Sequence, residues 1–290
     1  MKALSRSILV LILSVCVFAC TEVPPYINYS PDVVLSKDTC YVIQELPDAQ
    51  LRNVLVEDIS GVRCSNCPDA AEKAHAIDEK HEGRVVIATL HPTSQSNFTT
   101  PWGDDDFRTQ EAENIYTNLI GAVTGLPTGA ISRRKFSAEP TIAMTRHKWM
   151  AYAEEILSET AVVNLELLSE VDTTTREVNL DVKTTFLEED ETPVYLTIMV
   201  LESGIIQPQT DGVKVDTFYT HNDILRFTHT LYNGIVISDN PQRGLVCEKE
   251  FSIKIPEEIV LENVSIAVLV NKLDPDNKEV LQCTEVDLSE

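Results

Sequence analysis

The stretch from residue 54 to residue 68 constrains the fold of this chain more than any other part of the sequence. It reads V-L-V-E-D-I-S-G-V-R-C-S-N-C-P: a short β-forming run, a break at Ser60-Gly61, and two cysteines two residues apart. The alanine-rich segment that follows has a helical period. The sequence therefore predicts that Cys64 and Cys67 lie where a strand passes into the first turn of a helix. Pro68 fits this position because the first N–H groups of a helix have no partner to lose.

A cysteine at the start of a helix is well placed for thiol chemistry. Partial positive charge and free N–H groups can lower the pKa of such a thiol from about 8.5 to a range of about 3.5–7.5. We expect Cys64 to be the exposed nucleophile and Cys67 the buried residue that resolves the mixed disulfide. A structural disulfide or half of a zinc site are the alternatives, but no further metal-ligand pair follows at close spacing, so neither metal nor cofactor is predicted. The arrangement resembles a thioredoxin-like active site.

Composition and charge bound the class of protein. Hydrophobic residues make up 43% and charged residues 24% of the 290 residues, which is typical of a folded protein of one to two domains. The formal net charge of −23 repels nucleic acid, and because no basic patch is present, DNA or RNA binding is excluded. The same charge disfavours direct adsorption to anionic lipid.

Residues 1–19 predict a lipoprotein signal peptide. Two basic residues precede an apolar run that is too short for a permanent transmembrane helix. The run ends in Ala19-Cys20, which resembles the lipobox of bacterial lipoproteins, so we expect lipid on Cys20 to anchor the chain to the membrane. An ordinary signal peptide with a free Cys20 is the alternative. Residues 20–38, which include several prolines, then predict a tether.

The remaining cysteines leave their pairing open. Besides the pair at 64 and 67, the mature chain would hold Cys40, Cys247 and Cys283 in a compartment that permits disulfides. An odd total leaves at least one thiol free. Cys247 and Cys283 can pair if their strands are neighbours, and two buried free cysteines are the alternative.

Residues 39–159 predict an α/β domain. A strand is expected at 39–43, and the helix after the cysteines at 65–82. The continuous apolar run at 84–91 is typical of a strand buried on both faces of a parallel sheet, joined by a right-handed crossover. Two further helices are expected, at about 104–120 and 138–158.

The loop Gly125-Leu126-Pro127-Thr128 follows the first of these later helices. It resembles the loop of thioredoxin-like proteins whose proline is cis and faces the cysteine pair, although cis peptide bonds are rare in general. The backbone of Leu126, next to Pro127, is then the predicted edge for binding an extended substrate peptide.

Residues 160–290 change from helical to strand-like patterning and predict a second, all-β domain. Short alternating or apolar segments are separated by turns rich in Asp, Asn and Pro, which favours an immunoglobulin-like β-sandwich. The antibody signature of Cys, Trp and Cys is missing, so only the general architecture is predicted. The expected strands are 162–168, 177–186, 194–201, 224–230, 245–255, 264–270 and 279–286.

Several motifs occur together: the lipobox at Cys20, the C-x-x-C-P site, the G-L-P-T loop, and H-N-D-I-L-R beginning at His221 in a β-rich tail. In combination they resemble the 28-kDa outer-membrane-protein-related lipoproteins of the Bacteroidetes over nearly the whole mature chain. The resemblance implies a thioredoxin-like domain with an appended β domain in the cell envelope, at the outer membrane. It implies no defined reaction.

The site departs from a working thioredoxin in ways that bear on activity. Arg63 replaces the usual aromatic residue before the first cysteine, and its charge is expected to lower the pKa of Cys64. Glu57 and Asp58 are candidates for the acid near the resolving cysteine, and strand alternation lets only one of them point that way.

Two functions stay open at this point. In the first, the chain exchanges thiols and disulfides with envelope proteins or peptides through Cys64 and Cys67. In the second, the β-sandwich binds a partner and the thioredoxin-like part is a scaffold with a fixed disulfide. The sequence leaves open whether the chain is an enzyme and whether it faces the periplasm or the outside.

Overall fold

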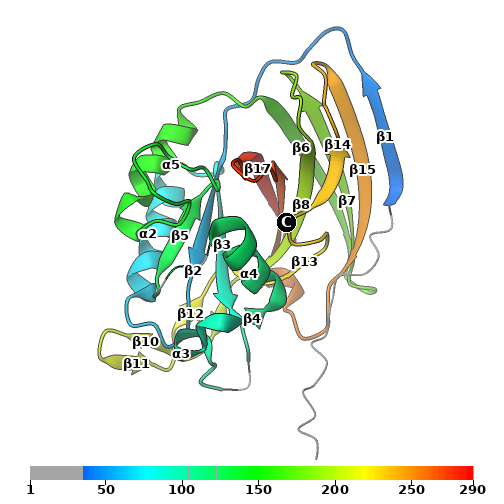
Figure 1. Ribbon diagram of the computed structural model, residues 1–290. Helices are drawn as coiled ribbons and strands as arrows, with labels where there is room; N and C mark the ends of the chain where they lie inside the picture. Colours follow the sequence, from blue (N-terminus) through cyan, green and yellow to red (C-terminus); the bar gives the residue numbers. More distant parts are fainter. Residues whose placement is uncertain (1–34, 104, 122, 124, 290) are drawn as a thin grey trace, which may run out of the picture.

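A computed structural model describes residues 35–103, 105–121, 123 and 125–289 (Figure 1). The predicted signal peptide, the lipid-bearing Cys20 and most of the predicted tether lie outside the described residues. Strands predominate over helices and form two large sheets and two small two-stranded ones. In the described ranges, no helix combines the length and the apolar character needed to cross a membrane.

The larger sheet has nine strands and contains segments from both halves of the chain. At one end of the main path, β3 pairs in parallel with β2, and β5 runs antiparallel to β2 as the edge strand. Two short strands, β4 and β14, pair with β3 and β8 beside the main path. The order along the main path is β17 (Val280–Asp287), β16 (Val264–Asn271), β8 (Val194–Glu202), β13 (Ile224–Thr228), β3 (Val85–Pro92), β2 (Val54–Ile59) and β5 (Thr128–Ile131); β4 spans Arg108–Thr109 and β14 Ile235–Ser238.

One pairing joins the two halves of this sheet. Thr89 of β3 lies opposite Ile224 of β13 in parallel register, and the backbone N–H of Thr89 donates to the carbonyl of Asp223 over 2.7 Å. The sheet therefore continues across residue 160, where the sequence predicted a domain boundary. That boundary stays a prediction, whereas the strands expected in the second half are confirmed to within a few residues.

The smaller sheet has the order β1 (Leu35–Val42), β15 (Leu245–Lys254), β7 (Glu177–Phe186) and β6 (Val163–Asp172). The strand expected at 39–43 forms, but it starts inside the predicted tether and pairs with a strand of the second half, at the outer edge of the sheet (Figure 1). Cys40 and Cys247 face each other in this pairing and form a disulfide. The considered pairing of Cys247 with Cys283 is thus wrong, because Cys283 lies in the other sheet as a buried free thiol.

The helices are shorter than the sequence suggested. The segment expected to be helical from 138 is irregular as far as Thr145, because Pro140 disfavours helical geometry before it, and a 3-10 turn, Arg146–Lys148, leads into α5. The helix expected from 104 starts at α4 and continues as a π-helical segment, Ile115–Gly121. The α-helices are α2 (Cys67–Lys80), α3 (Ser96–Thr99), α4 (Gln110–Asn114) and α5 (Trp149–Leu157); the other 3-10 turns are Thr93–Gln95 and Leu261–Asn263.

Alternation along β2 decides which residues face which core. Val54 and Val56 pack with buried residues of α2 and α5 on one face of the sheet. Leu55 and Ile59 pack with α4 and the π-helical segment on the other face (Figure 1). Because side chains alternate along a strand, the even-numbered residues of β2 point toward α2. A third core, made by strands of both large sheets, holds the four-stranded sheet against β8 and β16.

We expect the Cys40–Cys247 disulfide to contribute measurably to the free energy of unfolding. The two residues are 207 positions apart, and a cross-link that closes so long a loop restricts the unfolded chain strongly. Cys40 is exposed, so Cys40→Ser removes the bond without placing a polar group in the core. We expect the variant to lose about 2–5 kcal/mol of unfolding free energy in urea titrations.

The control is Cys64→Ala with Cys67→Ala, which opens a disulfide between residues only three positions apart and buries no polar group. Its loss should be smaller, since the loop-closure contribution grows with loop length. Equal urea midpoints for Cys40→Ser and the unchanged protein would show that the Cys40–Cys247 bond contributes little to stability.

Candidate functional site

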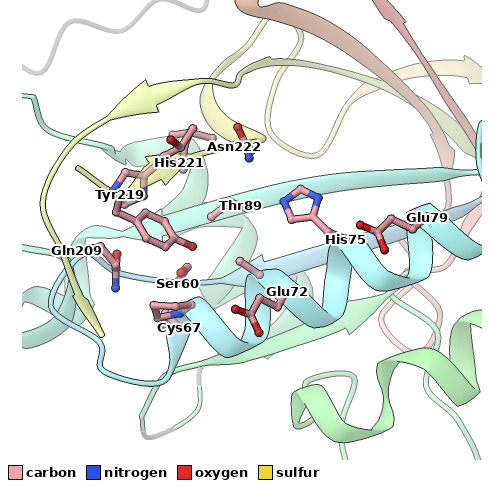
Figure 2. Close-up of a pocket in the computed structure, with 14 residues that line it drawn as sticks. Ser60, Cys67, Glu72, His75, Glu79, Thr89, Gln209, Tyr219, His221 and Asn222 are labelled. Atoms are coloured by element: carbon pink, nitrogen blue, oxygen red, sulfur yellow. The ribbon is translucent and has the colours of Figure 1, made fainter. Parts of the chain in front are cut away.

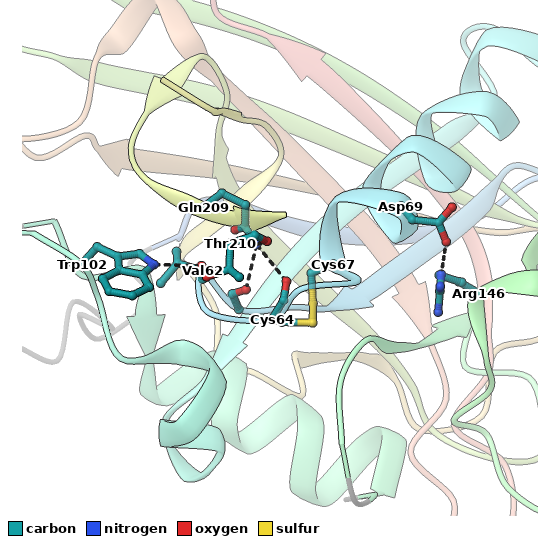
Figure 3. The surroundings of a disulfide bond; sticks show 9 residues. Val62, Cys64, Cys67, Asp69, Trp102, Arg146, Gln209 and Thr210 are labelled. Carbon is teal, nitrogen blue, oxygen red and sulfur yellow. Dashed lines mark hydrogen bonds and ion pairs between the residues drawn. A yellow bond between two sulfur atoms is a disulfide. The ribbon is translucent and has the colours of Figure 1, made fainter. Parts of the chain in front are cut away.

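The cysteine pair sits in a tight loop between β2 and α2. The backbone N–H of Cys64 donates to the carbonyl of Gly61 over 3.0 Å, and that of Cys67 to the carbonyl of Cys64 over 3.2 Å. Gly61 allows the chain to pass under Phe98, because a Cβ at this position would lie 2.5 Å from the Phe98 carbonyl oxygen. Cys64 and Cys67 form a disulfide at the N-terminus of α2, as the sequence led us to expect of this motif (Figure 3).

The expected difference in exposure between the two cysteines is wrong. Cys64 is 1% exposed and Cys67 2% exposed, so both are buried. The cover comes from two segments distant in sequence, the loop before residue 103 and a hairpin of the second half. Neither contact could be read from the local motif.

The second of these covers is a β-hairpin that we call the 205–221 hairpin. It consists of β9 (Ile205–Ile206) paired with β12 (Thr220–His221), and β10 (Gln209–Asp211) paired with β11 (Lys214–Asp216). In Figure 1 its tip lies beside the start of α2. It is part of the connection from β8 to β13, so the sheet pairing of β13 with β3 places it next to the cysteine loop.

Hydrogen bonds tie this hairpin to the cysteine loop. The buried side-chain amide of Gln209 donates to the carbonyls of Gly61 and Cys64, at 3.3 and 3.1 Å (Figure 3). The backbone N–H of Thr210 donates to the carbonyl of Val62 over 2.8 Å. That of Gly212 donates to the carbonyl of Ser65 over 3.0 Å.

Arg63 contacts the other cover. Its guanidinium lies 3.9 Å from the centre of the Trp102 ring and donates to the carbonyls of Thr100 and Pro101. The indole N–H of Trp102 donates to the carbonyl of Val62 over 3.2 Å. The structure thus shows Arg63 holding the 100–102 loop against the cysteine loop. That its charge lowers the pKa of the Cys64 thiol stays a prediction.

The two neighbouring acids of β2 have different surroundings. Glu57 points away from α2 and forms a fully buried ion pair with Arg133, whose Nη2 and Nε donate to the carboxylate at 2.6–3.0 Å. Asp58 points to the α2 side and is 1% exposed. Within the described residues, neither of its carboxylate oxygens has a hydrogen-bond partner. The structure therefore selects Asp58 of the two candidates as the acid on the side of the cysteines.

Burial raises the pKa of the Asp58 carboxyl to about 8, because the charged form loses its hydration, and Arg146 opposes this shift only in part. Asp58 also lies near Tyr219: burial, followed by the charge of Asp58, raises the pKa of Tyr219 to about 12. Tyr219 lines the same cavity as Cys67 and Ser60. Asp58 and the cysteine pair therefore belong to one region of the molecule.

That cavity has a volume of about 390 Å³ and runs along one face of α2 (Figure 2). Cys67, Glu72, His75 and Glu79 line it from the helix, and residues of the 205–221 hairpin, with Asn222 just beyond it, line the opposite wall. Burial lowers the pKa of His221 to about 4, so this imidazole is neutral at physiological pH. In the described part of the chain, no group of three or more His, Cys, Asp or Glu side chains could hold a metal ion.

The predicted substrate loop lies at the same end of the sheet. The Leu126–Pro127 peptide bond is cis, as the sequence predicted. Thr128, the first residue of β5, pairs with Ile59, so Pro127 lies immediately before β5 at the end of the sheet where β2 leads into the cysteine loop. Leu126 is partly buried against the core beside α4.

Sequence reasoning missed the residues of the hairpin. Gln209 and Tyr219 carry no local motif, and they reach the cysteines only through the pairing of β13 with β3. His221 was noticed as the start of H-N-D-I-L-R, but its place in the cavity wall was not predicted.

Solved structures with a similar fold share little sequence with this chain. HBP35 of Porphyromonas gingivalis has a TM-score of 0.66 at 16% identity, over 84% of this chain and 77% of that protein. Protein AGR_C_4864 from Agrobacterium tumefaciens has a TM-score of 0.51 at 14% identity, over 84% and 97% of the two chains. A domain of the outer membrane lipoprotein Omp28 from Porphyromonas gingivalis is matched at 18% identity over 44% of this chain and 88% of that domain, with a TM-score of 0.27.

At such low identity the first two likenesses show a shared fold and nothing of activity. No curated protein matches the chain. The family described as outer membrane protein Omp28 matches residues 113–290, which is more than half of the sequence. This chain therefore belongs to the Omp28 family and is a protein of the outer-membrane cell envelope.

Proposed function

We propose that this chain exchanges thiols and disulfides with envelope proteins or peptides through Cys64 and Cys67. In this proposal, residues 39–159 form a thioredoxin-like unit and residues 160–290 an immunoglobulin-like one, with lipid on Cys20 as the membrane anchor. The position of the pair at the N-terminus of α2, with Leu126-Pro127 at the same sheet edge, supports the first assignment. The stacking of the four-stranded sheet on β8 and β16 supports the second.

The reaction starts from the reduced pair. The Cys64 thiolate attacks a substrate disulfide, which forms a Cys64–substrate disulfide and releases one substrate thiolate. The ionised form of Asp58, which is the minor form at neutral pH because the pKa of this carboxyl is about 8, then accepts the Cys67 proton, through water where direct contact is not made. The Cys67 thiolate attacks the Cys64 sulfur. The products are the Cys64–Cys67 disulfide and the second substrate thiol, so the substrate is reduced and the pair is oxidised. Transfer in the opposite direction follows the same steps in reverse.

The observation that carries this proposal is the state of Asp58. A buried carboxyl group without a hydrogen-bond partner destabilises a fold, and a structural disulfide gains nothing from one nearby. A pKa of about 8 suits a group that takes up and releases protons near neutral pH.

A second function has an observation in its favour. The exposures of Cys64 and Cys67 are 1% and 2%, and a disulfide so deeply covered is what a fixed scaffold requires. In that case the protein is a binding or structural lipoprotein, and the cysteine pair only closes the loop before α2.

Trapping separates the two functions. With Cys67→Ser, the mixed disulfide on Cys64 cannot be resolved, so disulfide-linked envelope proteins should accumulate and be detected by non-reducing electrophoresis and mass spectrometry. The matched control is Cys64→Ser, which removes the nucleophile and should trap far less. If both variants trap equally little under conditions in which the pair is reduced, the scaffold function is favoured.

The raised pKa of Asp58 predicts a pH-dependent stability. An unfolded aspartate has a pKa of about 3.9, so between about pH 4 and pH 8 the folded chain keeps a proton that the unfolded chain has lost. Stability therefore falls as pH rises through this window, and the neutral Asp58→Asn variant should escape the loss. We expect it to be more stable than the unchanged protein by about 2–4 kcal/mol at pH 7, with the two converging near pH 4.

Urea midpoints measured from pH 4 to pH 8 test this expectation. Asp181→Asn serves as the control, because Asp181 is exposed on β7 and its replacement removes the same charge. Parallel pH profiles for Asp58→Asn and the unchanged protein would mean that Asp58 does not hold a proton in the folded state.

A further inference from the structure

The cysteine loop is attached firmly on one side and lightly on the other. On the firm side, β2 is buried along its whole length, and α2 buries Cys67, Ala70, Ala74 and Ile77 against the sheet. On the light side, the 205–221 hairpin contacts the loop through the bonds of Gln209, Thr210 and Gly212 described above.

The hairpin itself is built from short and exposed pieces. Its paired strands have only two or three residues each, and every residue of β11 is exposed. Val213 at its tip is 99% exposed, and Phe218, between β11 and β12, is 81% exposed, so neither of these large apolar side chains packs against the rest of the protein. Segments with few buried contacts open at low free-energy cost, whereas core strands open only with the whole fold.

Access to the sulfur atoms therefore depends on this hairpin more than on the core. Exchange requires an incoming sulfur in line with the bond it breaks, and two cysteine residues that are only 1% and 2% exposed leave little room for such an approach. The contacts of the hairpin include the carbonyls of Cys64 and Ser65, within the C-x-x-C motif. The 98–102 loop instead bonds Val62 and Arg63, ahead of the motif.

We propose that the 205–221 hairpin is a lid over the cysteine pair, that Gln209 is its latch, and that polypeptide substrates reach Cys64 only when the lid has lifted. Gln209 suits this role because its amide nitrogen shares its two hydrogens among two carbonyls of the loop and the Thr210 carbonyl of the hairpin, and because it is 3% exposed, so its bonds are shielded from water. The paired residues of β9 and β12 form the base on which the lid turns. The role of the lid in substrate admission rests on the proposed exchange function, whereas the opening itself does not.

The neighbouring glutamine of the same hairpin provides a matched control. The side-chain amide of Gln207 donates to a carboxylate oxygen of Asp105 over 2.7 Å and does not bond the cysteine loop. Gln207→Ala and Gln209→Ala thus remove the same group from one element, and only the second removes the latch.

The test uses the oxidised, full-length mature protein. Dithiothreitol reduces the pair: its thiolate attacks the Cys64 sulfur and releases Cys67 as a thiolate, and its second thiol then closes to cyclic oxidised dithiothreitol. Timed alkylation and peptide mass spectrometry follow Cys64 and Cys67 separately from the Cys40–Cys247 bond. We expect Gln209→Ala to be reduced about threefold to tenfold faster than the unchanged protein, the change produced by losing one or two modest hydrogen bonds. Gln207→Ala should keep the original rate.

Hydrogen exchange distinguishes local opening of the hairpin from a general loss of stability. In Gln209→Ala, peptides that contain Thr210 and Gly212 should exchange faster, while those of β2 and β3 keep their protection. Equal reduction rates for the two glutamine variants, or faster exchange throughout the chain, would overturn the lid.

The reduction and trapping experiments together distinguish a failure of the lid from a failure of the proposed exchange function. Faster reduction in Gln209→Ala, without mixed disulfides in Cys67→Ser, would mean that the lid covers a structural disulfide. Trapping in Cys67→Ser, with unchanged reduction in Gln209→Ala, would mean that exchange takes place without this lid.

Discussion

The parallel pairing of Thr89 with Ile224 is the constraint on which the site depends. It is a small contact, one residue pair and a backbone bond of 2.7 Å to Asp223, yet it joins strands from the two halves into one sheet. Because β13 is fixed beside β3, the hairpin that precedes it has to leave the sheet next to α2. The part of the cover that the hairpin supplies is therefore a consequence of sheet order, and a chain with the same C-x-x-C motif but another neighbour for β3 would lack that part.

Strand β2 carries two buried acidic residues, and each avoids the cost of an uncompensated buried charge in a different way. Glu57 and Asp58 are adjacent on β2 and almost fully buried, but they face opposite sides of the sheet. Glu57 is balanced by the bidentate contact with Arg133, a pair whose loss on one side would leave an uncompensated charge at a cost of about 3–5 kcal/mol. Asp58 has no such partner, and it avoids the cost by keeping its proton up to about pH 8. The first acid fixes the structure, and the second is left chemically available.

The sequence predicted the local features well and the long-range ones poorly. The strand of Val54–Ile59, the position of Cys67 at the start of a helix, the cis bond before Pro127 and the strands of the second half follow from periodicity and turn residues, or from the resemblance. The partner of Cys40 and the cover from Gln209 do not, because both depend on strand order between segments more than a hundred residues apart. The choice between Glu57 and Asp58 could be predicted only in part. Alternation along the strand showed that only one of the two acids could face the cysteines. The structure identifies it as Asp58, because Val56, on the same face of the strand, packs with residues of α2.

Burial of the disulfide and isolation of Asp58 bear on function in opposite directions, and the lid that we propose would reconcile them. A fixed structural disulfide accounts for the burial but leaves an unpartnered carboxyl group that weakens the fold at neutral pH. An always open exchange site accounts for the carboxyl group but not for the cover by Gln209, Thr210 and Gly212. A pair that is covered at rest and uncovered on opening accounts for both. Burial holds the pKa of Asp58 high in this structure, and if the proposed opening admitted water to this carboxyl, its pKa would fall at the moment when a base is needed.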